Sequence, residues 1–249
     1  MTGSTFKDLF SLQAADYARF RPVYPPELFT WLAAQAPAKA LAVDVGTGNG
    51  QAAVALARHF ERVIGVEPSD DQRANATPAP NVEYRRGTAE ATGVEAASAD
   101  LLTVAQAFHW FKHDAFFAEV RRVVRPGGCA AFWCYGLTTI SSEIDAAVHT
   151  YYEDLLGAYW EPERKLVEQG YRGIAVPFDE LVTPPFAMQL RWSLDHLLGY
   201  LGTWSPRKRF LAERGRDALE IALPDLRRAW GDAGERDVSW PLSVRAFRI

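Results

Sequence analysis

The chain has 249 residues, of which 48% are hydrophobic and 23% charged, as in an ordinary globular protein. This composition excludes a disordered chain, and 18 glycines and 15 prolines are too few for a collagen-like or linker-dominated one. The formal net charge of −4 argues against bulk binding to nucleic acid, because neutralising phosphates requires a basic surface.

No targeting or membrane signal is visible in the sequence. No apolar run approaches the ~20 residues of a membrane span, and the N-terminus lacks a charged-then-apolar signal pattern. Two cysteines, Cys129 and Cys134, lie in one apolar stretch at an odd spacing, which places them on opposite faces of a strand. We therefore expect reduced cysteines in a cytoplasmic protein that binds neither nucleic acid nor membranes.

Short apolar runs alternate with amphipathic stretches over the first two thirds of the chain, which predicts βα units and a parallel sheet. A first helix is expected to open at Pro25-Pro26, because proline suits the first helical turn. The following elements are expected, in chain order, to be a strand at 41–45, a helix after Gly50, strands at 62–67, 82–86 and 101–105, a helix ended by 125–128, and a strand at 129–135.

The pattern changes after residue 135. Residues 136 to about 185 lack strand signals, and a helix is expected behind Ser141-Ser142. Period-2 alternation predicts late strands at 186–192 and 237–249, the second beginning or bulging at Pro241, with helices over 193–231 between them. We expect one domain over 1–249, made of an N-terminal lid and helix (1–36), a core (37–135), a helical hood (136–185 and 193–231) and the two late strands.

A glycine-rich turn joins the first buried strand to its helix. Asp44 ends the strand, and Gly46, Gly48 and Gly50 follow at alternate positions. Glycines allow a tight turn and close approach of a ligand, and the N–H groups at the start of a helix favour an anionic or polar group. A dinucleotide fingerprint has its third glycine one residue later, so the spacing counts against an NAD-type oxidoreductase.

An acidic residue, Glu67, ends the second strand 23 positions after Asp44. Its two oxygens can accept the protons of both ribose hydroxyls, which supports nucleoside binding without choosing the cofactor. After the third strand, Gly87-Thr88-Ala89-Glu90 is placed to meet an adenine edge. An aromatic cluster, Gln106 to Phe111, follows the fourth strand, and Arg122 to Gly128 forms the next helix-to-strand turn.

Taken in order, these five elements resemble the motifs of class I S-adenosylmethionine-dependent methyltransferases. With them, Tyr17 to Pro25 and Tyr200 to Ser205 resemble the trans-aconitate methyltransferase-like subgroup, whose members act on small molecules. The sequence departs from that pattern at Gln72, where Met is common, so an apolar contact with adenine is not predicted. The resemblance implies a Rossmann-like α/β fold with a seven-stranded mixed sheet, helices on both faces and a hood inserted after the fifth strand.

The resemblance also implies the site. S-adenosyl-L-methionine is the expected cofactor, and the residues expected to bind it are Asp44, Gly46, Thr47, Gly48, Gly50, Glu67, Pro68, Ala89, Glu90 and Gln106. The residues expected to bind a small-molecule acceptor are Tyr17, Arg19, Arg21, Tyr24, Phe108, Trp110, Trp133 and Tyr135. His109 is the candidate catalytic residue, either as a base or as a donor to the acceptor.

Methyl transfer from a sulfonium is a direct displacement, so the protein mainly supplies alignment and exclusion of water. A carboxylate acceptor needs no base but needs cationic groups, preferably arginine, which favours Arg19 and Arg21 on the lid. The leading hypothesis is methylation of a carboxylate oxygen. An NAD-type oxidoreductase and a non-catalytic methyltransferase-like binding module stay open, as does the oligomeric state. The sequence has no metal-binding motif, so no metal is expected.

Overall fold

The computed structural model describes residues 22–249. Its centre is one mixed sheet in the order β3-β2-β1-β4-β5-β8-β6, in which β1 to β5 are parallel and β8 is antiparallel to its neighbours. The parallel strands are β1 (Leu41–Val45), β2 (Arg62–Val66), β3 (Val82–Arg85), β4 (Ala99–Ala105) and β5 (Val124–Tyr135). The antiparallel part consists of β6 (Asp179–Leu181), β7 (Phe186–Trp192) and β8 (Arg236–Arg248). This arrangement confirms the predicted α/β fold.

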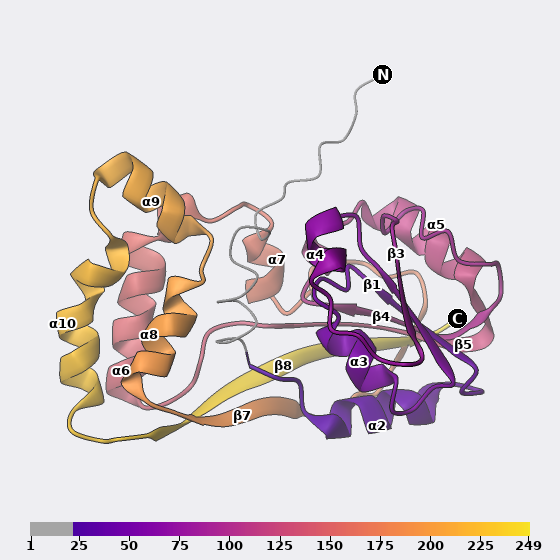
Figure 1. The fold of residues 1–249 in the computed structure, drawn as a ribbon, viewed down its shortest axis with the longest axis horizontal. Helices are drawn as coiled ribbons and strands as arrows, with labels where there is room; N and C mark the ends of the chain where they lie inside the picture. Colours follow the sequence, from indigo (N-terminus) through magenta and orange to yellow (C-terminus); the bar gives the residue numbers. More distant parts are fainter. Residues whose placement is uncertain (1–21) are drawn as a thin grey trace.

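Helices cover both faces of the sheet, as expected (Figure 1). On one face α2 (Pro26–Gln35) and α3 (Gln51–Leu56) bury their apolar side chains in a core shared with β5, β7 and β8. On the other face α5 (His113–Val123) packs Phe116, Phe117 and Val120 against β1, β4 and β5. The central strand β4 is buried on both faces, which explains why its sequence reads as a continuous apolar run.

The short strand β6 corrects the prediction that 136–185 contains no strand. β6 and β7 pair with successive parts of β8, with Leu181 opposite Ala246 and Phe186 opposite Leu242. Five residue steps from Leu181 to Phe186 therefore lie opposite four steps from Ala246 to Leu242 on β8. The extra residue lies in 182–185, where two prolines remove ladder donors. Within residues 22–249, eight strands thus fill the seven predicted positions, because β6 and β7 both pair with the same edge of β8.

The last strand does not begin or bulge at Pro241, so that prediction is wrong. β8 begins at Arg236 and passes through Pro241, which stands in regular register opposite Ala187. β5 joins β8 only from Leu242 onward. On that side of β8 the proline lies between the end of the β5 ladder and an isolated bridge from Ser239 to Thr139, and its missing N–H interrupts neither.

The fifth strand also begins earlier than predicted. Val124 pairs with Ala99, and the regular ladder resumes where Leu101 pairs with Cys129. The turn at 125–128 therefore forms an irregularity inside β5. It contacts the end of the chain, because the Gly127 N–H donates to the Ile249 carbonyl at 2.7 Å.

The predicted hood is helical. Figure 1 shows α6, α8, α9 and α10 grouped beyond the end of the paired strands β7 and β8, with α7 between that group and the core. Side chains of Ser141, Ser193 and Asp217 cap α6, α8 and α10. The hood elements are α6 (Ser142–His149), the π-helical η3 (Thr150–Leu155), η4 (Gly157–Tyr159), α7 (Arg164–Glu168), α8 (Leu194–Gly202), α9 (Pro206–Arg214) and α10 (Ala218–Trp230). The carboxyl ends of the parallel strands face this group.

Candidate functional site

The turn after β1 has the backbone that its glycines predict. Gly50 adopts φ 84°, and a Cβ there would lie 2.0 Å from the Tyr84 hydroxyl oxygen, so only glycine fits. Gly48 adopts φ 55°, and a Cβ there would meet no atom within 4 Å. The backbone at Gly48 is therefore open on the side where a ligand would approach.

Asp44 is fully buried beneath this turn. Its carboxylate accepts hydrogen bonds from the hydroxyls of Thr47 at 2.6 Å and Thr103 at 2.7 Å. Burial raises the pKa of Asp44 to about 6, against the lowering effect of these two bonds, and the nearby charge of Glu67 raises it slightly further. Asp44 thus fixes the turn to β4 and changes its charge close to neutral pH.

Glu67 connects the turn to the end of β2. One carboxylate oxygen accepts the Gly48 N–H at 2.9 Å, and the other accepts the Ser69 N–H at 3.0 Å. The side chain is 5% exposed. A carboxylate oxygen has two lone pairs and can accept more than one hydrogen bond, so the chemistry of Glu67 suits ribose hydroxyls.

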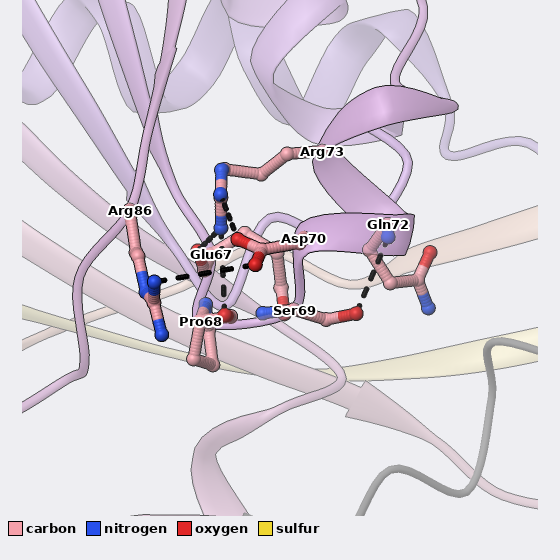
Figure 2. Close-up of polar contacts among 7 residues, drawn as sticks. All are labelled: Glu67, Pro68, Ser69, Asp70, Gln72, Arg73 and Arg86. Carbon is pink, nitrogen blue, oxygen red and sulfur yellow. Dashed lines mark hydrogen bonds and ion pairs between the residues drawn. The ribbon is translucent and has the colours of Figure 1, made fainter.

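The backbone behind Glu67 is also held (Figure 2). The Arg73 guanidinium donates to the carbonyls of Glu67 at 2.9 Å and Pro68 at 3.4 Å, and it pairs with Asp70. Ser69 caps the short helix α4 (Asp70–Ala74) by accepting the Gln72 N–H. The chain around the predicted ribose-binding carboxylate is therefore rigid on both sides.

The two residues expected at the adenine edge lie in a tight turn closed between Thr88 and Ala91. Ala89 is buried, and the Glu90 carboxylate accepts the Lys112 N–H at 3.0 Å. The structure thus ties this turn to the segment that precedes α5. The contact of Ala89 and Glu90 with a cofactor stays a prediction.

Gln106 joins the carboxyl ends of β4 and β5. Its side-chain amide donates to the Tyr135 carbonyl at 3.2 Å and accepts the Tyr135 N–H at 2.8 Å. Its φ of 56° is uncommon for a residue with a Cβ, and such conformations concentrate at functional sites. The side chain is therefore already engaged with backbone, and its predicted role toward the cofactor stays a prediction.

A pocket lies between these strand ends and the hood. The residues lining it are Gln106, His109, Trp110, Tyr135, Gly136, Trp160, Glu161, Arg164, Tyr200, Trp204 and Ser205. Four of them were predicted from the sequence: Gln106, His109, Trp110 and Tyr135. The pocket combines aromatic side chains with a few polar and charged ones, as small-molecule sites do.

Three predicted acceptor residues do not line this pocket. Phe108 is fully buried and stacks on Phe132 with ring centroids 4.5 Å apart. Trp133 is fully buried against Tyr24, at 5.6 Å between ring centroids. These side chains belong to the core beneath the strand ends. Tyr17, Arg19 and Arg21 lie outside the described residues.

His109 lies in the wall of the pocket and is 9% exposed. It follows β4 in a short 3₁₀ turn, η2 (Phe108–Trp110), and its Nδ1 lies 3.1 Å from the Tyr171 hydroxyl oxygen. Burial lowers its pKa to about 3, helped by the positive charges of Arg164 and His113. Burial also raises the pKa of Tyr171 well above its usual value. Both partners are therefore neutral at physiological pH.

Sequence reasoning missed Trp160, Glu161 and Arg164. They precede or begin α7, in a stretch without a strand pattern or a recognisable motif. The available signal was compositional: a tryptophan and an arginine lie together in an insertion that must fold over the carboxyl ends of the strands. Arg207 on α9 is not among the lining residues and pairs with Asp217.

Within residues 22–249, no group of three or more metal-ligating side chains is placed to hold an ion. Over the same residues, no helix has both the length and the apolar composition that crossing a membrane requires.

Comparison with known proteins identifies the family to which the chain belongs. The family model of a methyltransferase domain matches residues 43–132. A protein of Dictyostelium discoideum named as a methyltransferase is 37% identical, over 97% of this chain and 95% of its own length. A protein of Mycobacterium tuberculosis named as an uncharacterized methyltransferase is 36% identical over 48% of this chain and 49% of its own length.

Solved structures agree. A type II methyltransferase from Anaeromyxobacter dehalogenans superposes with a TM-score of 0.87 at 47% identity, covering 92% of this chain and 98% of that one. The chain therefore belongs to the class I S-adenosylmethionine-dependent methyltransferases, as its motifs predicted. The alternative of an NAD-type oxidoreductase is not supported.

Proposed function

We propose that this methyltransferase acts on a small molecule and methylates an oxygen of a carboxylate. The observation that carries the proposal is the pocket at the strand ends, which holds the cationic Arg164 and a histidine that is a poor base. A hydroxyl or amine acceptor needs a group that removes its proton. A carboxylate acceptor is already ionised and needs a cation to hold it.

The described residues fit the expected donor. Bound S-adenosylmethionine supplies a methyl group on a positively charged sulfur. Gly48 offers an open backbone, and Glu67 places a carboxylate, which can accept hydrogen bonds from ribose hydroxyls, beside it. We assign cofactor binding to Asp44, Gly46, Thr47, Gly48, Gly50, Glu67, Pro68, Ala89, Glu90 and Gln106, as the resemblance implies. Intact donor residues also argue against a binding module without catalysis.

His109 then acts without moving a proton. It is neutral, its Nδ1 contacts the Tyr171 hydroxyl, and the residue lines the pocket. In this role it positions the acceptor and excludes water rather than serving as a base. Glu161, which also lines the pocket, is paired with Arg209.

The pocket also favours the trans-aconitate methyltransferase-like subgroup. Two of the segments that carried that resemblance, 106–111 and 200–205, are distant in the chain, yet residues of both line the same pocket. We further propose that 1–249 acts as a single methyltransferase domain. Its cytoplasmic location, and a role of Arg21 in holding a carboxylate, stay predictions.

The test is transfer of a labelled methyl group to matched sets of acceptors. Each set contains a carboxylic acid, its carboxamide and its alcohol on the same carbon skeleton, with trans-aconitate among the acids. We expect label on acids and at most trace label on amides and alcohols. Preferential labelling of alcohols or of added amines would contradict a carboxylate acceptor and leave the donor site untouched.

A further inference from the structure

Aromatic rings form one wall of the pocket. Trp204 lies 5.7 Å from Trp160 and 5.8 Å from Tyr200, measured between ring centroids, and all three line the cavity. Tyr152 backs this wall, at 4.8 Å from Trp160. The wall therefore offers flat apolar surface of the kind that holds a flat apolar ligand.

The π-helical segment η3 builds this wall. Tyr151 and Tyr152 are adjacent in sequence, yet both rings contact Trp204, one stacked at 5.5 Å and the other edge-on at 5.7 Å. Both tyrosines lie within η3. π-Helical turns are rare and occur frequently at functional sites, which fits a wall shaped for a ligand.

A guanidinium lies against this aromatic wall. The Arg164 group is 4.9 Å from the Trp160 ring centroid and 5.4 Å from that of Tyr152, both cation–π distances. Its Nε donates to the Tyr152 hydroxyl at 2.9 Å, and that hydroxyl donates to Glu168. The rings and the hydroxyl thus hold the guanidinium in one orientation.

Arg164 has no ion pair with a carboxylate anywhere in 22–249, whereas neighbouring arginines are neutralised. Arg209 pairs with Glu161, and Arg207 pairs with Asp217. Only the Nε of Arg164 has a hydrogen-bond partner among these residues, so its two terminal amino groups keep their donors. The pocket wall therefore contains a fixed guanidinium that has no direct carboxylate partner among residues 22–249.

This charge also decides which ligand the aromatic rings favour. Aromatic clusters can bind an external cation, but here the chain's own guanidinium already lies over the rings of Trp160 and Tyr152. A second cation would be repelled, whereas an anion would meet the two terminal amino groups of Arg164.

We propose that Arg164 is the residue that selects the acceptor, by binding the carboxylate of a small molecule with a flat apolar body that lies against Trp160 and Trp204. The inference deepens the proposed function and rests on it. A lone pair of the carboxylate oxygen forms the bond to the methyl carbon, and the electrons of the breaking S–CH₃ bond pass to sulfur. The products are a neutral ester and a neutral thioether, and no proton moves. The ester has lost its charge, so Arg164 holds it less tightly and it can leave.

The experiment measures binding rather than turnover. Cinnamate, a flat apolar carboxylate, and its uncharged counterpart cinnamamide are titrated calorimetrically into the full chain saturated with S-adenosylhomocysteine. We expect the wild type to bind cinnamate at least ~10-fold more tightly than cinnamamide, the least that one charge-assisted bond contributes. Arg164→Gln is expected to remove this preference, and Arg164→Lys to retain part of it, because a point charge replaces a fork.

The matched control is Arg228→Gln, an exposed arginine on α10 that pairs with Asp225, and it is expected to keep the wild-type preference. Affinity for S-adenosylhomocysteine serves as the measure of intact folding. If Arg164→Gln loses affinity for S-adenosylhomocysteine, the test rests on Arg164→Lys instead. A ratio of cinnamate to cinnamamide affinity that equals the wild-type ratio in Arg164→Lys then overturns the inference. An unchanged ratio in a folded Arg164→Gln, or a wild type that does not bind cinnamate, also overturns it.

Failure of the proposed function would look different. In that case no carboxylic acid gives a methyl ester, although cinnamate binding still depends on Arg164. Conversely, methyl esters formed equally well by Arg164→Gln would leave the proposed function standing and remove Arg164 from it.

Discussion

Substitution of Glu67 tests the donor site at its most specific residue. In Glu67→Gln one carboxylate oxygen becomes an amide nitrogen, which cannot accept a backbone N–H. Because the two oxygens accept from Gly48 and Ser69, either orientation of the amide places two donors together. The variant also loses one acceptor for a ribose hydroxyl. Glu67→Ala loses both acceptors and leaves two backbone N–H groups without their partner.

The magnitude follows from these bonds. A hydrogen bond to a charged group contributes roughly 1.5–3 kcal/mol, and 1.4 kcal/mol corresponds to a factor of ten in affinity. Glu67→Gln is therefore expected to weaken S-adenosylmethionine binding ~10- to 100-fold, and Glu67→Ala ~10²- to 10⁴-fold. Isothermal titration calorimetry measures both, with circular dichroism as the check of folding.

Glu83→Gln is the matched control. Glu83 is a half-exposed carboxylate on β3 that pairs with Arg62 and Arg85, and it lies on the strand beside β2. Its substitution is expected to leave donor affinity within about twofold, since screened surface pairs contribute little. Unchanged affinity in a folded Glu67→Ala would refute the assignment. So would equal affinity of the wild type for donor analogues with and without ribose hydroxyls.

Three further predictions concern the same site. Because the folded pKa of Asp44 is about 6 and its ordinary value is 3.8, the protonated carboxyl stabilises the fold. That contribution is complete below about pH 4 and is lost as pH rises through 6, in all about 3 kcal/mol at 1.36 kcal/mol per pH unit. In urea unfolding of Asp44→Asn, the free energy of unfolding should not show this decrease with pH. The same decrease in the wild type and the variant would contradict the prediction. His109→Gln should reduce acceptor turnover less than ~10-fold and leave the pH profile between about 5 and 8 unchanged, because the pKa of His109 is about 3; disappearance of a limb near neutrality would show that His109 is a base. Gly48→Val should abolish donor binding, whereas Gly215→Val, which has a similar φ of 64° and equally open surroundings in the hood, should not; loss of binding in both variants would point to backbone strain instead.

The strands and the donor turn could be predicted because local sequence determines them. Buried parallel strands read as apolar runs, and the turn from Asp44 to Gly50 has glycines where the backbone needs positive φ. β6 could not be predicted, since it has three residues and two of them are exposed, so no alternation marks it.

The acceptor side was harder to predict because contacts between distant segments build it. Trp133 lies in a strand that is buried on both faces, so period-2 alternation cannot separate a pocket-facing side chain from a core one. Arg164 reaches the pocket only through its packing on Trp160 and Tyr152, and Tyr152 lies in a π-helical turn that no local pattern predicts.

The central claim, that the transferred methyl group forms an ester, is tested most directly by the stability of the product in alkali. The protein is incubated with methyl-labelled S-adenosylmethionine and the small-molecule fraction of a cell extract, which requires no prior choice of acceptor. Mild alkali hydrolyses methyl esters and leaves N-methyl and methyl ether groups intact. The account predicts that most of the transferred label is released as volatile methanol, and label that stays on the product after alkali would contradict it.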